Sequence, residues 1–157
     1  MKIDHVNIVV SDMDRSVAFY ARLGLNKSLD THISGAWIAN LIGIHDEKLN
    51  ARVVFMETDA GETRLELIQY IVPPGAGSPL NSHPNTIGLR HFALAVDDIQ
   101  KTYQDLLRAG ITFFSEPQEV TGNKDVAARI GRKKLVYFLD PDGTIVELAE
   151  YNPPEIR

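Results

Sequence analysis

An internal repeat limits the folds available to this chain more than any other feature of its sequence. Residues 5–12 (HVNIVVSD) match residues 91–98 (HFALAVDD), because each segment begins with histidine, continues through mostly apolar residues and ends in Val-x-Asp. A second match, between 53–70 and 135–151, follows in the same order. Two matches in the same order predict one structural unit repeated twice.

Each repeat is predicted to contain the same strands. The segments that open the repeats are apolar and partly β-branched, as buried strands tend to be. Later in each repeat, two further apolar stretches flank a turn rich in aspartate and glycine, which predicts a β-hairpin. The opening strands are predicted at 3–10 and 89–96, and the hairpin strands at 52–58 with 64–70 and 135–139 with 144–150.

A helix is predicted directly after each opening strand. Asp12 and Asp98 are suited to cap the first turns, because a short carboxylate accepts the free amide hydrogens there. A glycine follows each predicted helix, where a left-handed backbone conformation commonly ends the helix. These signals predict helices at 13–23 and 99–109, ended by Gly24 and Gly110.

The predicted fold class is therefore α+β, with two tandem βαβββ modules. We expect the first module at 1–70, a linker rich in proline and glycine at 71–88, and the second module at 89–157. A chain of 157 residues is short enough for both modules to form one globular domain together.

The composition excludes several functional classes. Apolar residues make up 44% and charged residues 24%, the usual balance of a soluble globular protein, and the net charge of −5 counts against a nucleic-acid-binding surface. No apolar run is long enough to span a bilayer, and the first residues lack a signal-peptide pattern, so we expect a cytoplasmic protein. Cysteine is absent, which means that nitrogen and oxygen atoms must hold any metal.

Four titratable residues stand in otherwise apolar predicted strands: His5, Glu66, His91 and Glu147. A buried carboxylate is costly unless its charge is compensated. Strand alternation allows another interpretation, in which each glutamate simply faces solvent. The repeat favours a shared role, because the same residue types occupy equivalent positions in both halves. Two imidazoles and two carboxylates suit a divalent first-row metal.

The motifs around these residues resemble those of the vicinal oxygen chelate superfamily. This group includes glyoxalase I, methylmalonyl-CoA epimerase, extradiol dioxygenases, and the fosfomycin and bleomycin resistance proteins. The resemblance covers nearly the whole chain and is carried by HVNIVV at 5–10, LEL at 65–67, RHFALAVDD at 90–98 and DPDGTIVEL at 140–148.

The resemblance implies a cupped, eight-stranded mixed sheet around one divalent metal ion (Ni, Zn, Co or Mn), with His5, Glu66, His91 and Glu147 as ligands. Open metal positions would accept two adjacent oxygens of a small-molecule substrate. Family analogy puts Glu147 first and Glu66 second as the carboxylate that moves a substrate proton. The implied function is a glyoxalase-I-like lyase, isomerase or epimerase acting through an enediolate-type intermediate, in a homodimer.

Two other activities within the superfamily stay open. If Glu66 points away, the triad of His5, His91 and Glu147 fits an extradiol dioxygenase with iron. A non-catalytic protein that binds an antibiotic or another small molecule is the third possibility. Residues 6–10 contain no arginine, whereas bacterial glyoxalase I generally carries one on the first strand, so glutathione is not the expected substrate partner. The segments 31–50 and 71–88 suggest a distinct pocket wall.

Several other polar residues are expected to have ordinary surface roles. These are His32, His45 and His83, together with a basic stretch in which a solvated face is favoured over substrate binding: Arg129, Arg132, Lys133 and Lys134. Trp37 is expected either in the core or on the wall of the cup.

Overall fold

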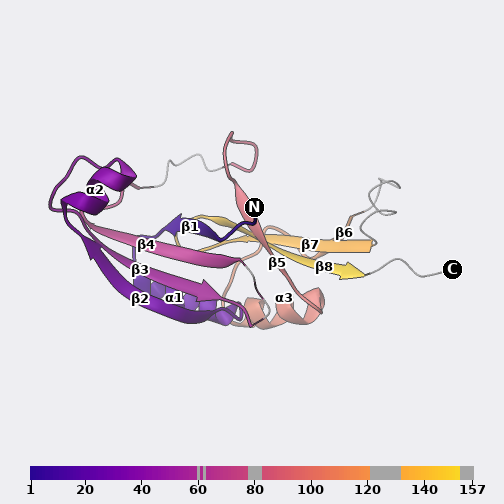
Figure 1. The fold of residues 1–157 in the computed structure, drawn as a ribbon. Coiled ribbons are helices and arrows are strands. Elements are labelled where there is room, and N and C mark those ends of the chain that lie inside the picture. Colours follow the sequence, from indigo (N-terminus) through magenta and orange to yellow (C-terminus); the bar gives the residue numbers. More distant parts are fainter. Residues whose placement is uncertain (60, 62, 78–82, 121–131, 153–157) are drawn as a thin grey trace. The chain divides into compact units, whose positions relative to one another are not determined.

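A computed structural model of the chain describes residues 1–157 except 60, 62, 78–82, 121–131 and 153–157 (Figure 1). The chain divides into two compact units, Met1–Ser78 and Pro79–Arg157, called here the first and the second unit. The expected α+β class and the two βαβββ modules are confirmed, and the described strands form two mixed sheets of four.

The first unit is a mixed sheet accompanied by helices. Its strands lie in the order β1-β4-β3-β2, with β1 parallel to β4 and the other neighbours antiparallel. The elements are β1 (His5–Val9), α1 (Met13–Arg22), β2 (Asn26–Ser34), α2 (Ala36–Ile42), β3 (Asn50–Glu57) and β4 (Arg64–Val72).

The second unit repeats this topology. Its strands lie in the order β5-β8-β7-β6, again with a parallel first pair and antiparallel neighbours beyond it. The elements are β5 (His91–Ala95), α3 (Ile99–Arg108), β6 (Gln118–Glu119), β7 (Arg132–Leu139) and β8 (Ile145–Asn152). The outer strand β6 has two residues, whereas its counterpart β2 has nine.

The two long helices begin where the sequence predicts. Asp12 accepts a hydrogen bond from the Arg15 amide, and Asp98 accepts one from the Lys101 amide, so both are N-caps. The glycines that follow these helices have left-handed backbone, with φ of 87° and 86°. Both helices have ten residues, and in the described part of the chain no helix is long and apolar enough to cross a membrane.

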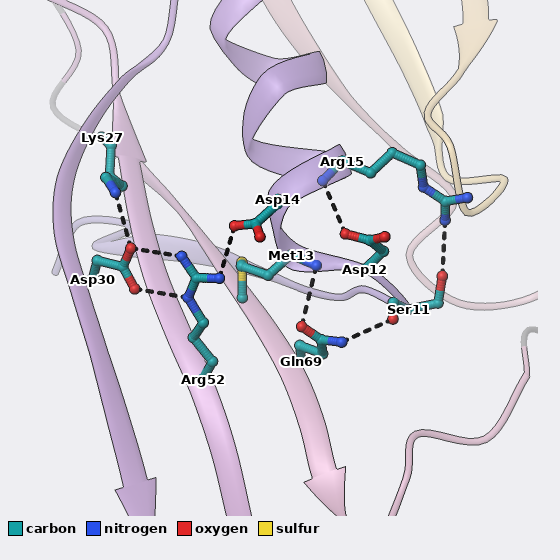
Figure 2. A network of polar contacts seen from close by, with 9 residues as sticks. All are labelled: Ser11, Asp12, Met13, Asp14, Arg15, Lys27, Asp30, Arg52 and Gln69. Atoms are coloured by element: carbon teal, nitrogen blue, oxygen red, sulfur yellow. Dashed lines mark hydrogen bonds and ion pairs between the residues drawn. The ribbon is translucent and has the colours of Figure 1, made fainter.

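Each helix start is also held by a side chain from the last strand of its sheet. In the first unit, Gln69 of β4 accepts a hydrogen bond from the Met13 amide at 3.2 Å and donates one to the Ser11 carbonyl at 3.0 Å (Figure 2). In the second unit, Glu150 of β8 accepts one from the Ile99 amide at 2.8 Å. These bonds satisfy amide groups that the helix itself leaves free.

One face of each sheet forms the core beneath its helix. Alternate residues of a strand share a face, so Leu67 lies on the same face as the helix-capping Gln69. Leu67 is fully buried, and its counterpart Leu148 is 1% exposed. The helices bury their own apolar side chains, among them Phe19, Tyr20, Tyr103 and Leu106. The opposite sheet faces are left for the candidate site.

The helix α2 is an element that the sequence analysis did not predict. Gly35 precedes it without a side-chain cap, and Gly43 ends it in left-handed backbone, with φ of 76°. Its buried residues form a cluster with Leu49, and Ile33 and Tyr70 pack against both this cluster and that of Ala51, Val53 and Ile68. Trp37, by contrast, is 65% exposed on this helix. The cluster places α2 beside the sheet face that carries Glu66, because Glu66, Ile68 and Tyr70 alternate along β4.

Candidate functional site

In the first unit, the predicted residues His5 and Glu66 lie together. The Nε2 atom of His5 is 3.4 Å from Oε2 of Glu66. Strand register explains the contact. Asn7 on β1 lies directly opposite Glu66, and His5, two residues earlier, lies on the same face of the sheet. Phe55 on β3 lies opposite Glu66 on its other side. The His5 ring also meets the edge of Phe55, with a centroid distance of 5.7 Å.

Two neighbours orient this pair. Asp4 lies 3.0 Å from Nδ1 of His5, so the Nδ1 hydrogen can be donated to Asp4 while the Nε2 lone pair faces Glu66. The Asn7 amide donates to Oε2 of Glu66 at 3.1 Å and to the Glu66 carbonyl at 3.3 Å. A histidine whose second ring nitrogen is held by a carboxylate is the usual arrangement of a metal-binding histidine.

The second unit contains the equivalent pair. The Nε2 atom of His91 is 3.3 Å from Oε2 of Glu147. Ala93 and Tyr137 lie opposite Glu147, in the same register as Asn7 and Phe55 opposite Glu66. The His91 ring contacts Tyr137 edge-on at 5.4 Å between centroids. The repeat thus reproduces the histidine, the glutamate and the aromatic ring in the same relative places.

The surroundings of Glu147 differ from those of Glu66. Lys133 places its Nζ atom 2.6 Å from Oε1 of Glu147 and 5.3 Å from the centre of the Tyr151 ring. Burial lowers the pKa of Lys133, but the contacts with Glu147 and then Tyr151 together outweigh it, and the net shift is upward. Burial and then the hydrogen bond to Glu147 raise the pKa of Tyr137 to about 12. Burial and then the charge of Glu66 also raise the pKa of Tyr70.

Neither glutamate turns its side chain freely to solvent. The side chain of Glu66 is 18% exposed and that of Glu147 is 4% exposed, although alternation allows a strand residue to face water. The residues beside them, Leu65, Leu67, Val146 and Leu148, are buried on the opposite faces. Both carboxylates therefore need partners where they lie.

The distances in each pair suit a shared metal ion. Two ligand atoms about 2.1 Å from a zinc ion and at the tetrahedral angle lie about 3.4 Å apart. Nitrogen and carboxylate donors match the expected set, and the Asp4 contact fixes His5 for binding through Nε2. Within the described ranges, no three histidine, cysteine, aspartate or glutamate side chains form a group that could hold a metal ion.

The other singled-out residues are placed as follows. Arg132 donates to Glu119 at 2.9 and 3.0 Å, and Lys134 lies 3.5 Å from Glu150, whereas Arg129 is outside the described residues. His32, His45 and His83 are exposed, as expected.

Lys133 departs from the interpretation as part of a solvated face, because only 17% of its side chain is exposed. Alternation along β7 is the signal that could have identified it: Lys133, Leu135 and Tyr137 share one face, and Tyr137 lies opposite Glu147. The roles of Asn7, Asp4 and Lys133 beside the two pairs were not predicted from the sequence.

Comparison with known proteins identifies the family. The profile of the Glyoxalase/Bleomycin resistance protein/Dioxygenase superfamily matches residues 2–148. The chain belongs to this superfamily. Biphenyl-2,3-diol 1,2-dioxygenase 3 from Rhodococcus globerulus is 32% identical over 71% of this chain and 53% of its own length. Human mitochondrial methylmalonyl-CoA epimerase is 26% identical over 95% of this chain and 73% of its own.

A solved structure supports the fold of this superfamily member. A glyoxalase family protein from Bacillus cereus has a TM-score of 0.80 at 23% identity, with 96% of this chain and 94% of that chain covered. The superfamily resemblance noted in the sequence is thus confirmed, and the relatives of this chain include proteins named as a lyase, an epimerase and a dioxygenase.

Proposed function

We propose that this superfamily member is a metal-dependent lyase, isomerase or epimerase acting on a small metabolite with two adjacent oxygens. One divalent ion would be held by His5, Glu66, His91 and Glu147, which requires the two units to present their pairs to the same ion, within one chain or in a homodimer. The observation that supports this most is the repeated contact of a histidine Nε2 with a glutamate Oε2, at 3.4 and 3.3 Å.

The chemistry follows from the donor set. A bound divalent cation supplies Lewis acidity, which makes a proton beside a substrate carbonyl easier to remove. A carboxylate of the site can then accept that proton and return it to the neighbouring carbon or to the other face of the same carbon. Phe55 and Tyr137 place aromatic rings edge-on against the two histidines, where they restrict the orientation of the imidazole rings.

Metal content and proton exchange test this proposal. Protein purified without chelator should contain about one equivalent of Ni, Zn, Co or Mn per four-ligand site, and His5→Ala should remove most of it. In deuterated water, the metal-loaded protein should exchange the α-proton of a 2-hydroxycarbonyl compound or an acyl thioester. Full metal occupancy in both His5→Ala and His91→Ala would refute the proposed site.

A dioxygenase is the second candidate, because the Rhodococcus globerulus relative acts on biphenyl-2,3-diol by its name. In that case iron would be held by His5, His91 and Glu147, with Glu66 unnecessary for binding. Anaerobically loaded Fe(II) protein should then consume oxygen in the presence of a catechol. No oxygen uptake, together with α-proton exchange, would decide for the first candidate.

A further inference from the structure

We infer that the two glutamates have unequal roles: Lys133 is a positioning residue that keeps Glu147 on the metal, and Glu66 is the carboxylate free to leave the metal and meet the substrate. This inference rests on the proposed function. Family analogy puts Glu147 first as the carboxylate that moves the substrate proton, and this inference puts Glu66 first instead. It comes from the contacts of this chain alone.

The two oxygens of Glu147 serve different partners. Oε1 accepts from Lys133 Nζ at 2.6 Å, while Oε2 faces His91 Nε2 at 3.3 Å. Both side chains of the ion pair are largely buried, with 4% of Glu147 and 17% of Lys133 exposed. Oε2 thus stays available as a single-oxygen ligand while the ammonium holds Oε1.

Glu66 lacks such a partner. The residue at the place of Lys133 in the first unit is Ala51, and the aromatic ring opposite Glu66 belongs to Phe55, which has no hydroxyl. Among the described residues, no lysine or arginine side chain pairs with Glu66. Its polar contacts are the neutral amide of Asn7 and the ring of His5.

The energetic consequence follows from these contacts. Both bonds end on a carboxylate and are charge-assisted, but the Lys133 bond joins two opposite charges, whereas the Asn7 donor is uncharged. Moving Glu147 away would also leave the ammonium of Lys133 unpaired in a largely buried place, which is strongly unfavourable. Moving Glu66 gives up a hydrogen bond from an uncharged amide at a more exposed position and leaves no cation unpaired. Release of Glu66 is therefore the less costly movement.

The test compares metal binding in four variants, with Co²⁺ as the probe. Relative to wild type, Glu147→Gln should weaken Co²⁺ binding at least tenfold more than Glu66→Gln does. Lys133→Met should weaken Co²⁺ binding by about 10-fold, the scale of other residues that orient a metal ligand, and should change the visible Co²⁺ spectrum. Lys134→Met is the matched control, because Lys134 contacts Glu150 instead.

A second measurement separates positioning from a general effect on folding. Lys133→Arg should restore the wild-type Co²⁺ spectrum, and Glu66→Gln should keep its Co²⁺ while losing α-proton exchange. Equal loss of Co²⁺ in the two glutamine variants would overturn the inference, as would wild-type Co²⁺ affinity and spectrum in Lys133→Met. Wild-type protein that binds no metal would instead refute the proposed function, and the inference with it.

Discussion

The two units share a backbone plan and differ in the charge placed around it. In both, a histidine opens the first strand and contacts a glutamate on the fourth, in identical register. The first unit surrounds its glutamate with an amide and a phenyl ring, whereas the second uses an ammonium and a phenol. Duplication has preserved the positions that set the geometry, and divergence has changed the groups that set the electrostatics.

The helix starts show the same pattern. Gln69 and Glu150 occupy equivalent positions three residues after the two site glutamates, and each accepts a hydrogen bond from the first helical amide. Arg52 and Lys134 are also equivalent on their strands, yet Arg52 binds Asp30 and Asp14, while Lys134 reaches Glu150. At this pair of positions the second unit therefore directs its cation to the last strand, whereas the first unit directs it to β2 and α1 (Figure 2).

The largest losses of stability are expected from core substitutions, and they should be equal in the two units. Leu67→Ala and Leu148→Ala each remove an almost fully buried side chain from the core beneath a helix, which should cost about 3 kcal/mol of unfolding free energy each. Urea unfolding measures both. Leu41→Ala is the control, because Leu41 is 74% exposed and should change stability little. A difference between the two core variants above about 2 kcal/mol would show that the cores are not equivalent.

Removing the strand side chain that caps each helix should destabilise the second unit more than the first. Glu150→Ala removes a buried charged acceptor and leaves the Ile99 amide without its bond, so we expect a loss of about 2 kcal/mol. Gln69→Ala removes a neutral acceptor and should cost about 1 kcal/mol. Thermal unfolding of both variants and of Glu150→Gln, expected between them, tests this order. Equal losses would contradict the electrostatic difference between the units.

The N-cap residues should again behave alike. Asp12→Ala and Asp98→Ala should each cost about 1 kcal/mol, because each aspartate accepts one amide hydrogen bond at 3.0 and 2.8 Å. Asparagine at either position should retain most of this stability. Chemical denaturation of the four variants gives the comparison, and a loss confined to one unit would show that the Gln69 or Glu150 bond suffices in the other unit.

The smallest effect should be specific to the first unit and depend on pH. Arg52→Met removes an ion pair that is partly exposed, so the loss at pH 7 should be about 0.5–1 kcal/mol. Hydrogen bonds from Arg52 and then from Lys27 hold the pKa of Asp30 well below its usual value. A lowered folded-state pKa stabilises the protein above the unfolded-state pKa and stops doing so as the pH falls through the folded-state pKa.

The difference between wild type and Arg52→Met should therefore be constant at neutral pH and shrink only below about pH 4. Urea unfolding at pH 7, 5 and 3 measures it. A difference that grows toward low pH would contradict the assignment of Asp30 as the main partner of Arg52.

Much of the fold could be predicted from local sequence signals. The N-caps Asp12 and Asp98 and the turn that contains Gly143 depend on neighbouring residues alone. In that turn, Asp140 accepts hydrogen bonds from the amides of Asp142 and Thr144, as the Asp-Pro-Asp-Gly motif indicates. Repeated spacing also predicted equivalent positions for the two histidine–glutamate pairs, whereas a metal site formed by all four residues stays a prediction.

What was missed depends on contacts between distant residues. Helix α2 has seven residues between Gly35 and Gly43 and no polar cap, so its helical conformation depends on packing against Leu49. Lys133 reaches Glu147 across the hairpin, and a basic stretch read in isolation gives no sign of which lysine turns inward. Side-chain pairing of this kind follows from the strand register of the whole hairpin, which a basic stretch does not contain by itself.

The three-residue spacing from Glu66 to Gln69, repeated from Glu147 to Glu150, restricts how a duplicated gene can evolve. Odd spacing on a strand puts the carboxylate that contacts the histidine on one side and the helix-capping group on the other. A single-codon insertion or deletion between them would leave at most one of the two groups facing correctly. Connections such as 35–49, which contains α2, can lengthen in one copy, but these short strand segments can diverge only by substitution.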